Sequence, residues 1–210
     1  MRVDGQVVEQ PQFKVLAQKI EIDPKARLET LEAITILLHQ PAGDDAGDDA
    51  GAPPQRITAA TRAADDRSGI RPLQRHFSKL APTVPLQPGA GGLVVLTHDW
   101  RIARKLNDDA ASIEQEYIVE VSGTLGPDGI KLLNHGLSFN GRALPPIKVS
   151  WQSETRLRFA LKDGRPGQVA HMCERVGLKV LAMKRIRIGR VPMAGLPPGQ
   201  WRYLAANERF

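Results

Sequence analysis

The sequence predicts an α+β fold in which strands dominate. Three observations support this class. Compact apolar runs rich in β-branched residues are typical of buried strands, one segment carries apolar residues at helical spacing and a second is interpreted as a short helix, and glycine- or proline-rich turns separate them. With 210 residues, 41% of them hydrophobic, the chain is long enough for one substantial domain and a small appendage.

The strongest strand signals lie at residues 34–39 and 92–97, where apolar residues are nearly continuous. Asp99 is a fair N-cap for a helix over residues 100–106, and Gly177 should end a second helix that begins near Gly167. Extended segments are also expected at residues 116–121, 147–151, 156–161, 180–183 and 185–188. A sheet flanked by a few helices follows from this order.

The first 30 residues form a separate region in this reading. They contain short extended pieces, at 13–16 and 19–22, and a turn signal at Asp4 and Gly5. Such a segment is too small to hold a core by itself. We therefore expect one piece over residues 1–30 and a main domain over residues 31–210.

The segment 43–70 is expected to be a disordered acidic loop. The unit Gly-Asp-Asp-Ala occurs twice within residues 43–50, and the apolar content is low. Consecutive flexible aspartates without a ligand-forming turn make poor cation cages, so we predict no metal site there.

The charge balance favours a polyanionic partner. The formal net charge is +6 and the isoelectric point is near 9.7. Residues 175–210 hold eight basic residues against one acid, Glu208. A solvated basic surface explains the same composition, so charge alone names no partner.

Several function classes find no support. The single cysteine, Cys173, excludes an internal disulfide, and neither a signal-peptide core nor a membrane-spanning apolar run is present. The histidines lack metal-ligand spacing, and the glycines at 89–92 read as a tight turn rather than a phosphate loop. We expect a cytoplasmic protein without membrane contact, metal or cofactor.

Three segments, in chain order, resemble the signatures of the RsuA/RluB/RluE/RluF-type ribosomal RNA pseudouridine synthase family. The first is Leu-Leu-His-Gln-Pro-Ala-Gly at 37–43, against Leu-Asn-Lys-Pro-x-Gly in the family. The second has Pro-Leu-Gln at 85–87, Gly-Leu at 92–93, Leu-Thr-His-Asp at 96–99 and Glu-Gln-Glu-Tyr-Ile-Val at 114–119. The family there has Arg-Leu-Asp, Gly-Leu, Leu-Thr-Asn-Asp/His and a Lys-x-Tyr strand.

The third segment is the most specific. It runs through Gly-Gln-Val-Ala-His-Met-Cys-Glu at 167–174 and Met-Lys-Arg-Ile-Arg-Ile-Gly at 183–189 to Leu-Pro-Pro-Gly-Gln-Trp-Arg at 196–202. The family pattern is Arg-Gln-Ile-Arg-Arg-Met-Cys-Glu, Lys-Arg-x-Arg-Ile and Pro-x-Gly-Glu-Trp-Arg. The resemblance covers about residues 31–205, and residues 1–30 resemble the back half of an S4 RNA-binding domain.

The resemblance implies the pseudouridine synthase catalytic-domain fold, a mixed or antiparallel sheet flanked by helices, with a truncated S4-like piece before it. It also implies isomerisation of a flipped uridine in ribosomal or transfer RNA, without cofactor or metal. The nucleophilic Asp of the family falls on Gln87, its Arg partner on Ala170 and its base-packing Tyr on Tyr117.

The substitution at Gln87 leaves three readings open. An amide is no usable nucleophile, and neither Asp nor Glu occurs from Arg67 through His98. We favour an inactive RNA-binding relative, whose phosphate contacts come from Lys184, Arg185, Arg187, Arg190 and Arg202. The alternatives are an active synthase that uses another carboxylate, Asp99 or Asp163, and a protein-interaction module without an RNA role.

Overall fold

A computed structural model describes residues 2–8, 13–22, 33–43, 57–78 and 80–210. The chain divides into two compact units, Met1–Glu32 and Ala33–Phe210. In the first unit β1 (Arg2–Val3) pairs antiparallel with β2 (Gln6–Val7) and β3 (Ile20–Glu21). Asp4 and Gly5 both have positive φ, which confirms the turn expected there, whereas residues 13–16 form no strand.

A nine-stranded mixed sheet organises the second unit, which confirms the α+β class. The strand order is β10-β11-β7-β12-β6-β4-β14, and β13 and β5 pair with β12 and β6. All pairs are antiparallel except β12 with β6. The strands are β4 (Thr35–Gln40), β5 (Ala81–Thr83), β6 (Gly91–Thr97), β7 (Glu114–Gly123), β10 (Lys148–Ser153), β11 (Arg156–Lys162), β12 (Leu178–Ile188), β13 (Val191–Pro192) and β14 (Trp201–Tyr203).

The parallel contact between β12 and β6 joins two halves of this sheet. It consists of two residue pairs, Lys184 with Gly91 and Arg185 with Gly92. A Cβ on Gly92 would lie 2.2 Å from the backbone oxygen of Arg185, and the φ of Gly92 is +109°. Only glycine fits this close approach. The two halves of the sheet therefore meet where β6 has glycines, Gly91 and Gly92, facing β12.

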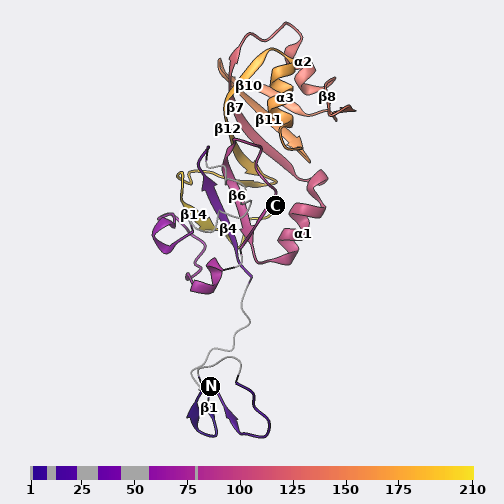
Figure 1. The fold of residues 1–210 in the computed structure, drawn as a ribbon. Coiled ribbons are helices and arrows are strands. Elements are labelled where there is room, and N and C mark those ends of the chain that lie inside the picture. Colours follow the sequence, from indigo (N-terminus) through magenta and orange to yellow (C-terminus); the bar gives the residue numbers. More distant parts are fainter. Residues whose placement is uncertain (1, 9–12, 23–32, 44–56, 79) are drawn as a thin grey trace. The chain divides into compact units, whose positions relative to one another are not determined.

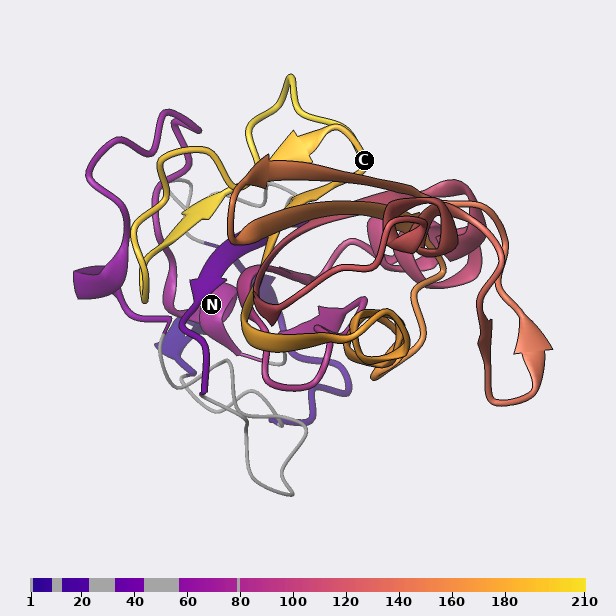
Figure 2. The same cartoon turned by 90° about the horizontal axis from the view of Figure 1, so that it is seen from above.

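Among the described residues, three α-helices cover the sheet. Figure 1 shows α2 (Gly129–Asn134) and α3 (Gln168–Arg175) beside the strands β10, β11 and β7, and α1 (Trp100–Asp108) beside β6. Seen from above, α3 lies to one side of these strands (Figure 2). One apolar core fills the space under α2 and α3, and two others lie on the opposite faces of β4 and β6. The smaller elements are β8 (Ser138–Phe139), β9 (Arg142–Ala143) and the 3-10 turns η2 (Ala59–Thr61), η3 (Gln74–Phe77) and η4 (Ala110–Ser112).

The element boundaries follow local signals closely where such signals exist. Asp99 caps α1 by accepting a hydrogen bond from the backbone N of Arg101, as expected, and Gly177 follows α3 with φ +86°. The two extended segments expected at 180–183 and 185–188 form one continuous strand, β12. Helix α2 was not expected, because the sequence at 126–129 predicts only a turn. The short helix that begins there buries Leu133 completely.

The expectation of disorder over residues 43–70 is corrected for residues 57–70. Ile57 and Ala63 are buried in apolar cores, and Trp201 Nε1 donates to the carbonyl of Thr58. Arg62 forms an ion pair of 2.8 Å with Asp66. Isolated apolar residues thus anchor a polar segment, and the duplicated acidic unit at 44–50 lies outside the described residues.

Candidate active site

Gln87 lies in a tight turn between β5 and β6. The backbone N of Ala90 donates to the carbonyl of Gln87, and Gly89 takes a positive φ in the same turn. Gln87 is only 4% exposed. The turn therefore directs a polar side chain into the protein rather than toward solvent.

The Gln87 amide has one partner and one unsatisfied atom. Its Nε2 donates to the backbone carbonyl of Arg165 at 2.8 Å, whereas its Oε1 is buried without a hydrogen-bond partner among the described residues. With the amide reversed, Gln87 Oε1 would lie against the Arg165 carbonyl oxygen, and neither atom could donate a hydrogen bond. The Arg165 carbonyl therefore determines which way the Gln87 amide is oriented.

The loop between β11 and α3 forms the other wall of this site. An added Cβ on Gly164 would lie 3.5 Å from Gln87 Nε2. The carbonyl of Arg165 also accepts from the backbone N of Gln168, whose side chain accepts from the backbone N of Arg165 at 3.1 Å. The loop that begins with Asp163, at φ 46°, therefore presents a fixed carbonyl to Gln87.

Arg185 ties the turn that holds Gln87 to three strands. Its side chain is fully buried in β12. The guanidinium donates to the backbone carbonyls of Leu93, Pro85 and Val84 at 2.8, 3.0 and 3.0 Å. It also donates to Gln115 Oε1 at 3.0 Å. These acceptors are all neutral, so hydrogen bonds rather than a counter-ion compensate this buried cation.

Tyr117 belongs to the same cluster. It is 1% exposed, its hydroxyl donates to Gln115 Oε1, and Arg185 Nη1 donates to that hydroxyl at 3.4 Å. The Arg185 Cζ lies 6.0 Å from the centre of the tyrosine ring. Burial lowers the pKa of Arg185 from its ordinary value, and Tyr117 opposes this shift. The structure thus joins Tyr117 to the segment directly before Gln87 through Arg185.

Arg185 therefore differs from the sequence expectation. We expected it to contact RNA phosphates, but a side chain with 0% exposure and five internal hydrogen bonds cannot do so in this conformation. Because the C-terminal segment is basic throughout, its sequence does not distinguish the buried Arg185 from the exposed cations around it. Its separation of about 100 residues from Val84 and Pro85 leaves no local signal of this role.

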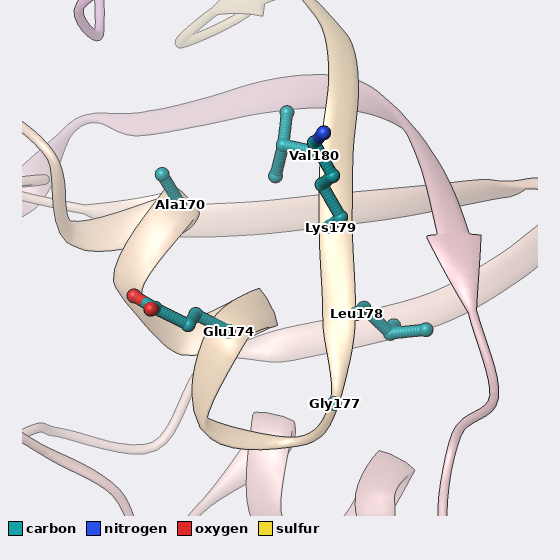
Figure 3. Close-up of a pocket in the computed structure, with 6 residues that line it drawn as sticks. All are labelled: Ala170, Glu174, Gly177, Leu178, Lys179 and Val180. Atoms are coloured by element: carbon teal, nitrogen blue, oxygen red, sulfur yellow. The ribbon is translucent and has the colours of Figure 1, made fainter.

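Ala170 lies on the exposed side of α3. It lines a hollow of about 490 Å³ with Glu174, Leu178 and Val180. Figure 3 shows Ala170 on α3 and Val180 on the neighbouring strand β12, with the Val180 side chain directed toward α3. Gln87 is not among the lining residues. Arg165 contacts Gln87 through its backbone carbonyl. The sequence reasoning missed this residue, although it lies two positions before the third motif.

The remaining predicted RNA-binding residues fall into two groups. Lys184 and Arg190 are exposed, and Lys184 lines a groove of about 430 Å³ with His39 and Gly92. Arg187 pairs with Glu114 and Glu116, and Arg202 forms two hydrogen bonds to the Glu208 carboxylate at 2.6 and 2.7 Å. The charges of Arg187 and Arg202, the second group, are thus already neutralised by carboxylates of the protein itself.

The described part of the chain also lacks two kinds of feature. It contains no group of three or more histidine, cysteine, aspartate or glutamate side chains that could hold a metal ion. None of its helices has the length and apolarity needed to cross a membrane. The side chains of Gln87 and of the hydrogen-bonded cluster formed by Arg185, Gln115 and Tyr117 are amides, a guanidinium and a phenol, which are hydrogen-bonding groups.

Comparison with known proteins identifies the relatives of this chain. No family model matches it. The dual-specificity RNA pseudouridine synthase RluF of Escherichia coli K12 is 28% identical over 149 residues, which are 71% of this chain and 51% of RluF. The chain thus spans about half the length of this relative. An uncharacterized RNA pseudouridine synthase of Aquifex aeolicus and the ribosomal large subunit pseudouridine synthase B of Bacillus subtilis are each 25% identical over 99% of this chain and 83% of their own lengths.

A solved structure supports the same assignment at the level of the fold. A crystal structure of a pseudouridylate synthase superposes with a TM-score of 0.65 at 19% identity, covering 97% of this chain and 84% of that one. The α+β sheet described above is therefore a pseudouridine synthase fold. The sequence relatives named above, at 25–28% identity, make the chain similar to RNA pseudouridine synthases of the RsuA/RluF type.

Proposed function

We propose that this chain is an RNA-binding member of its family that does not isomerise uridine. The observation that carries the proposal is Gln87, a buried amide at the position where the family resemblance puts the nucleophilic aspartate. The RNA partner in this proposal is ribosomal or transfer RNA, met in the cytoplasm. Neither cofactor nor metal takes part.

The chemistry of the amide supports the loss of catalysis. The family reaction starts from an ionised carboxylate, and a neutral amide cannot supply that nucleophile. In other enzymes, removal of the nucleophile costs about a millionfold in rate. Nε2 of Gln87 is also engaged by the Arg165 carbonyl, so the side chain is held in a structural hydrogen bond.

Access to the site supports the same conclusion. Tyr117, which would pack on the flipped base, is 1% exposed, and Gln87 is 4% exposed. A flipped nucleotide needs a pocket that receives the whole base. Binding there would first require the turn at Gln87 to separate from the Arg165 loop.

The salt dependence of RNA affinity tests the binding half of this proposal. Purified protein is titrated with unmodified ribosomal and transfer RNA at about 50 and about 200 mM salt. Phosphate contacts predict an affinity at least about tenfold weaker at the higher concentration. An affinity that is absent, or equal at both concentrations, would contradict RNA binding through phosphate contacts.

One observation favours the alternative of an active synthase. Asp163 takes a left-handed backbone conformation directly before Gly164, and the Gly164 backbone lies beside Gln87 Nε2. Asp99, the other candidate carboxylate, instead caps α1 at the far end of β6. Asp163 is thus the carboxylate that sequence order places next to the site.

Matched variants separate this alternative from the proposal. If the natural protein forms pseudouridine in RNA, Asp163→Asn should abolish the product. Asp99→Asn serves as the control, because asparagine caps helices as well as aspartate does. Product from the natural protein that only Asp163→Asn removes would establish the alternative and reject the inactive reading.

A further inference from the structure

Helix α1 presents an aromatic and basic side to solvent. Trp100 is 65% exposed, although tryptophan is usually well buried in folded proteins. Arg101, Arg104 and Lys105 are exposed on the same helix. We call these four residues the α1 outer face. Figure 1 shows α1 at the outside of its unit.

The opposite side of the helix fixes this orientation. Leu106 is fully buried, and Ile102 packs against the same apolar core. The Asp99 cap sets the first turn. Side chains three and four residues apart share one side of a helix, so Trp100 lies next to Arg104, and Arg101 next to Lys105.

The contacts within the α1 outer face are weak and leave its groups available. Arg101 Cζ lies 5.7 Å from the centre of the Trp100 ring, in a cation–π arrangement. Arg104 reaches Asp108 at 3.6 Å, but both side chains are more than 60% exposed, and such pairs contribute little. Arg187 and Arg202, by contrast, are held by buried or half-buried carboxylates.

We infer that the α1 outer face binds a single-stranded segment of RNA, with a base stacked on Trp100 and phosphates contacted by Arg101, Arg104 and Lys105. Aromatic platforms among cations are the usual means of holding single strands without reading sequence. An acidic protein partner would be bound by the cations alone and would leave the exposed Trp100 ring unexplained. A nucleic acid base explains it, because a base can stack on the ring beside the Arg101 guanidinium. This inference rests on the proposed RNA-binding function.

The position of the face allows it to act together with the candidate active site. The Gln87 turn precedes β6 and α1 follows it, and β6 has seven residues. A strand of this length spans roughly 20 Å. Several nucleotides of extended RNA can cover that distance, so the face would anchor RNA beside the site rather than within it.

Binding of a fluorescein-labelled oligouridylate of about a dozen nucleotides, followed by anisotropy, tests the inference. Trp100→Ala should weaken binding by about tenfold or more, because stacking on one aromatic ring contributes that much. The triple variant Arg101→Glu, Arg104→Glu, Lys105→Glu should reduce the salt slope by about 2. Quenching of Trp100 fluorescence should accompany binding.

Matched controls come from elsewhere on the surface. Trp151 is 41% exposed on β10, and Trp151→Ala removes a second accessible ring. Charge reversal of the exposed Arg142, Lys148 and Lys162 changes the net charge as much as the triple variant does. Both controls should bind within about twofold of the natural protein, and thermal melts should show all variants folded.

Each contrary outcome has a distinct meaning. Natural protein that binds RNA, with α1 variants that bind as the controls do, would overturn this inference and leave the proposed function standing. Absence of RNA binding by the natural protein would overturn both. Competition by duplex RNA or polyglutamate as strong as by the single strand would show attraction of polyanions without stacking, and would also reject the inference.

Discussion

Gln87 combines a satisfied donor with an unsatisfied acceptor in a buried position. Its Nε2 reaches the Arg165 carbonyl, and its Oε1 finds no partner in the described structure. A buried acceptor without a donor costs about 1–3 kcal/mol, which offsets the roughly 1 kcal/mol that the Nε2 hydrogen bond contributes. The amide therefore adds little to the stability of the fold.

Replacement of Gln87 by methionine tests this balance. Methionine has a similar length and shape but removes both the hydrogen bond and the unsatisfied oxygen. The Arg165 carbonyl keeps its bond from Gln168 N. We expect Gln87→Met to unfold in urea with a free energy within about 1 kcal/mol of the natural protein. A loss above about 2 kcal/mol would show that Oε1 has a partner.

Arg185 should behave in the opposite way. Its removal takes the side-chain donor from the carbonyls of Val84 and Pro85, and one of two donors from Gln115 Oε1. We expect Arg185→Met to lower the free energy of unfolding by about 3 kcal/mol or more. Arg190→Met, at an exposed position, should stay within about 0.5 kcal/mol. Equal effects of the two substitutions in urea titrations would refute the role assigned to Arg185.

At the scale of elements, an ion-pair ladder crosses three strands on the face of the sheet opposite Tyr117. Glu116 on β7 contacts Arg158 of β11 at 2.6 Å and Arg187 of β12 at 2.7 Å. Hydrogen bonding from Arg187, aided by Arg158, lowers the pKa of the Glu116 carboxyl from 4.5 to about 2, although burial opposes the shift. The ladder links the strands on either side of β7.

This shift predicts a specific acid sensitivity. The pKa of Glu116 is lower in the folded than in the unfolded state, so its charge stabilises the fold above about pH 4.5. That contribution should disappear as the pH falls from about 4.5 to about 2. Melting temperatures measured across this range should fall less steeply for Glu116→Gln than for the natural protein. Glu154→Gln, at an exposed position, should keep the natural slope, and a matching slope for Glu116→Gln would contradict the ladder.

The sequence predicts those elements whose signals are local. The cap at Asp99, the stop at Gly177 and the apolar runs of β4 and β6 each lie within a few residues of the element that they define. The site depends on contacts between distant residues. Gln87 meets Arg165 across 78 positions, so the resemblance could locate position 87 but not its neighbour.

Burial of charge was the property hardest to predict. A run of basic residues predicts an exposed surface. In β12, however, Arg185 is buried and Lys184 is exposed, because successive residues of a strand face opposite sides of the sheet. The expected disorder at 57–70 was wrong for a related reason. Single apolar residues such as Ile57 anchor a segment only once the sheet beneath it exists.

At the scale of the whole molecule, the candidate site lies where the two halves of the sheet join. Gln87 precedes β6, Arg185 belongs to β12, and these two strands form the parallel contact. The glycines there keep the halves close, and Arg185 connects them through side-chain hydrogen bonds. In the proposed function, the pseudouridine synthase fold is thus kept around an amide at the position where the family resemblance expects the nucleophile.

The most direct test of the proposed function is a pseudouridine assay of the purified natural protein on unmodified ribosomal and transfer RNA. Gln87→Asp and the double variant Gln87→Asp, Ala170→Arg are assayed in parallel, and product from either would show that the rest of the site is intact. If the proposed function is right, the natural chain forms no pseudouridine above the protein-free background. Turnover by the natural chain would contradict it and assign the nucleophile to another residue.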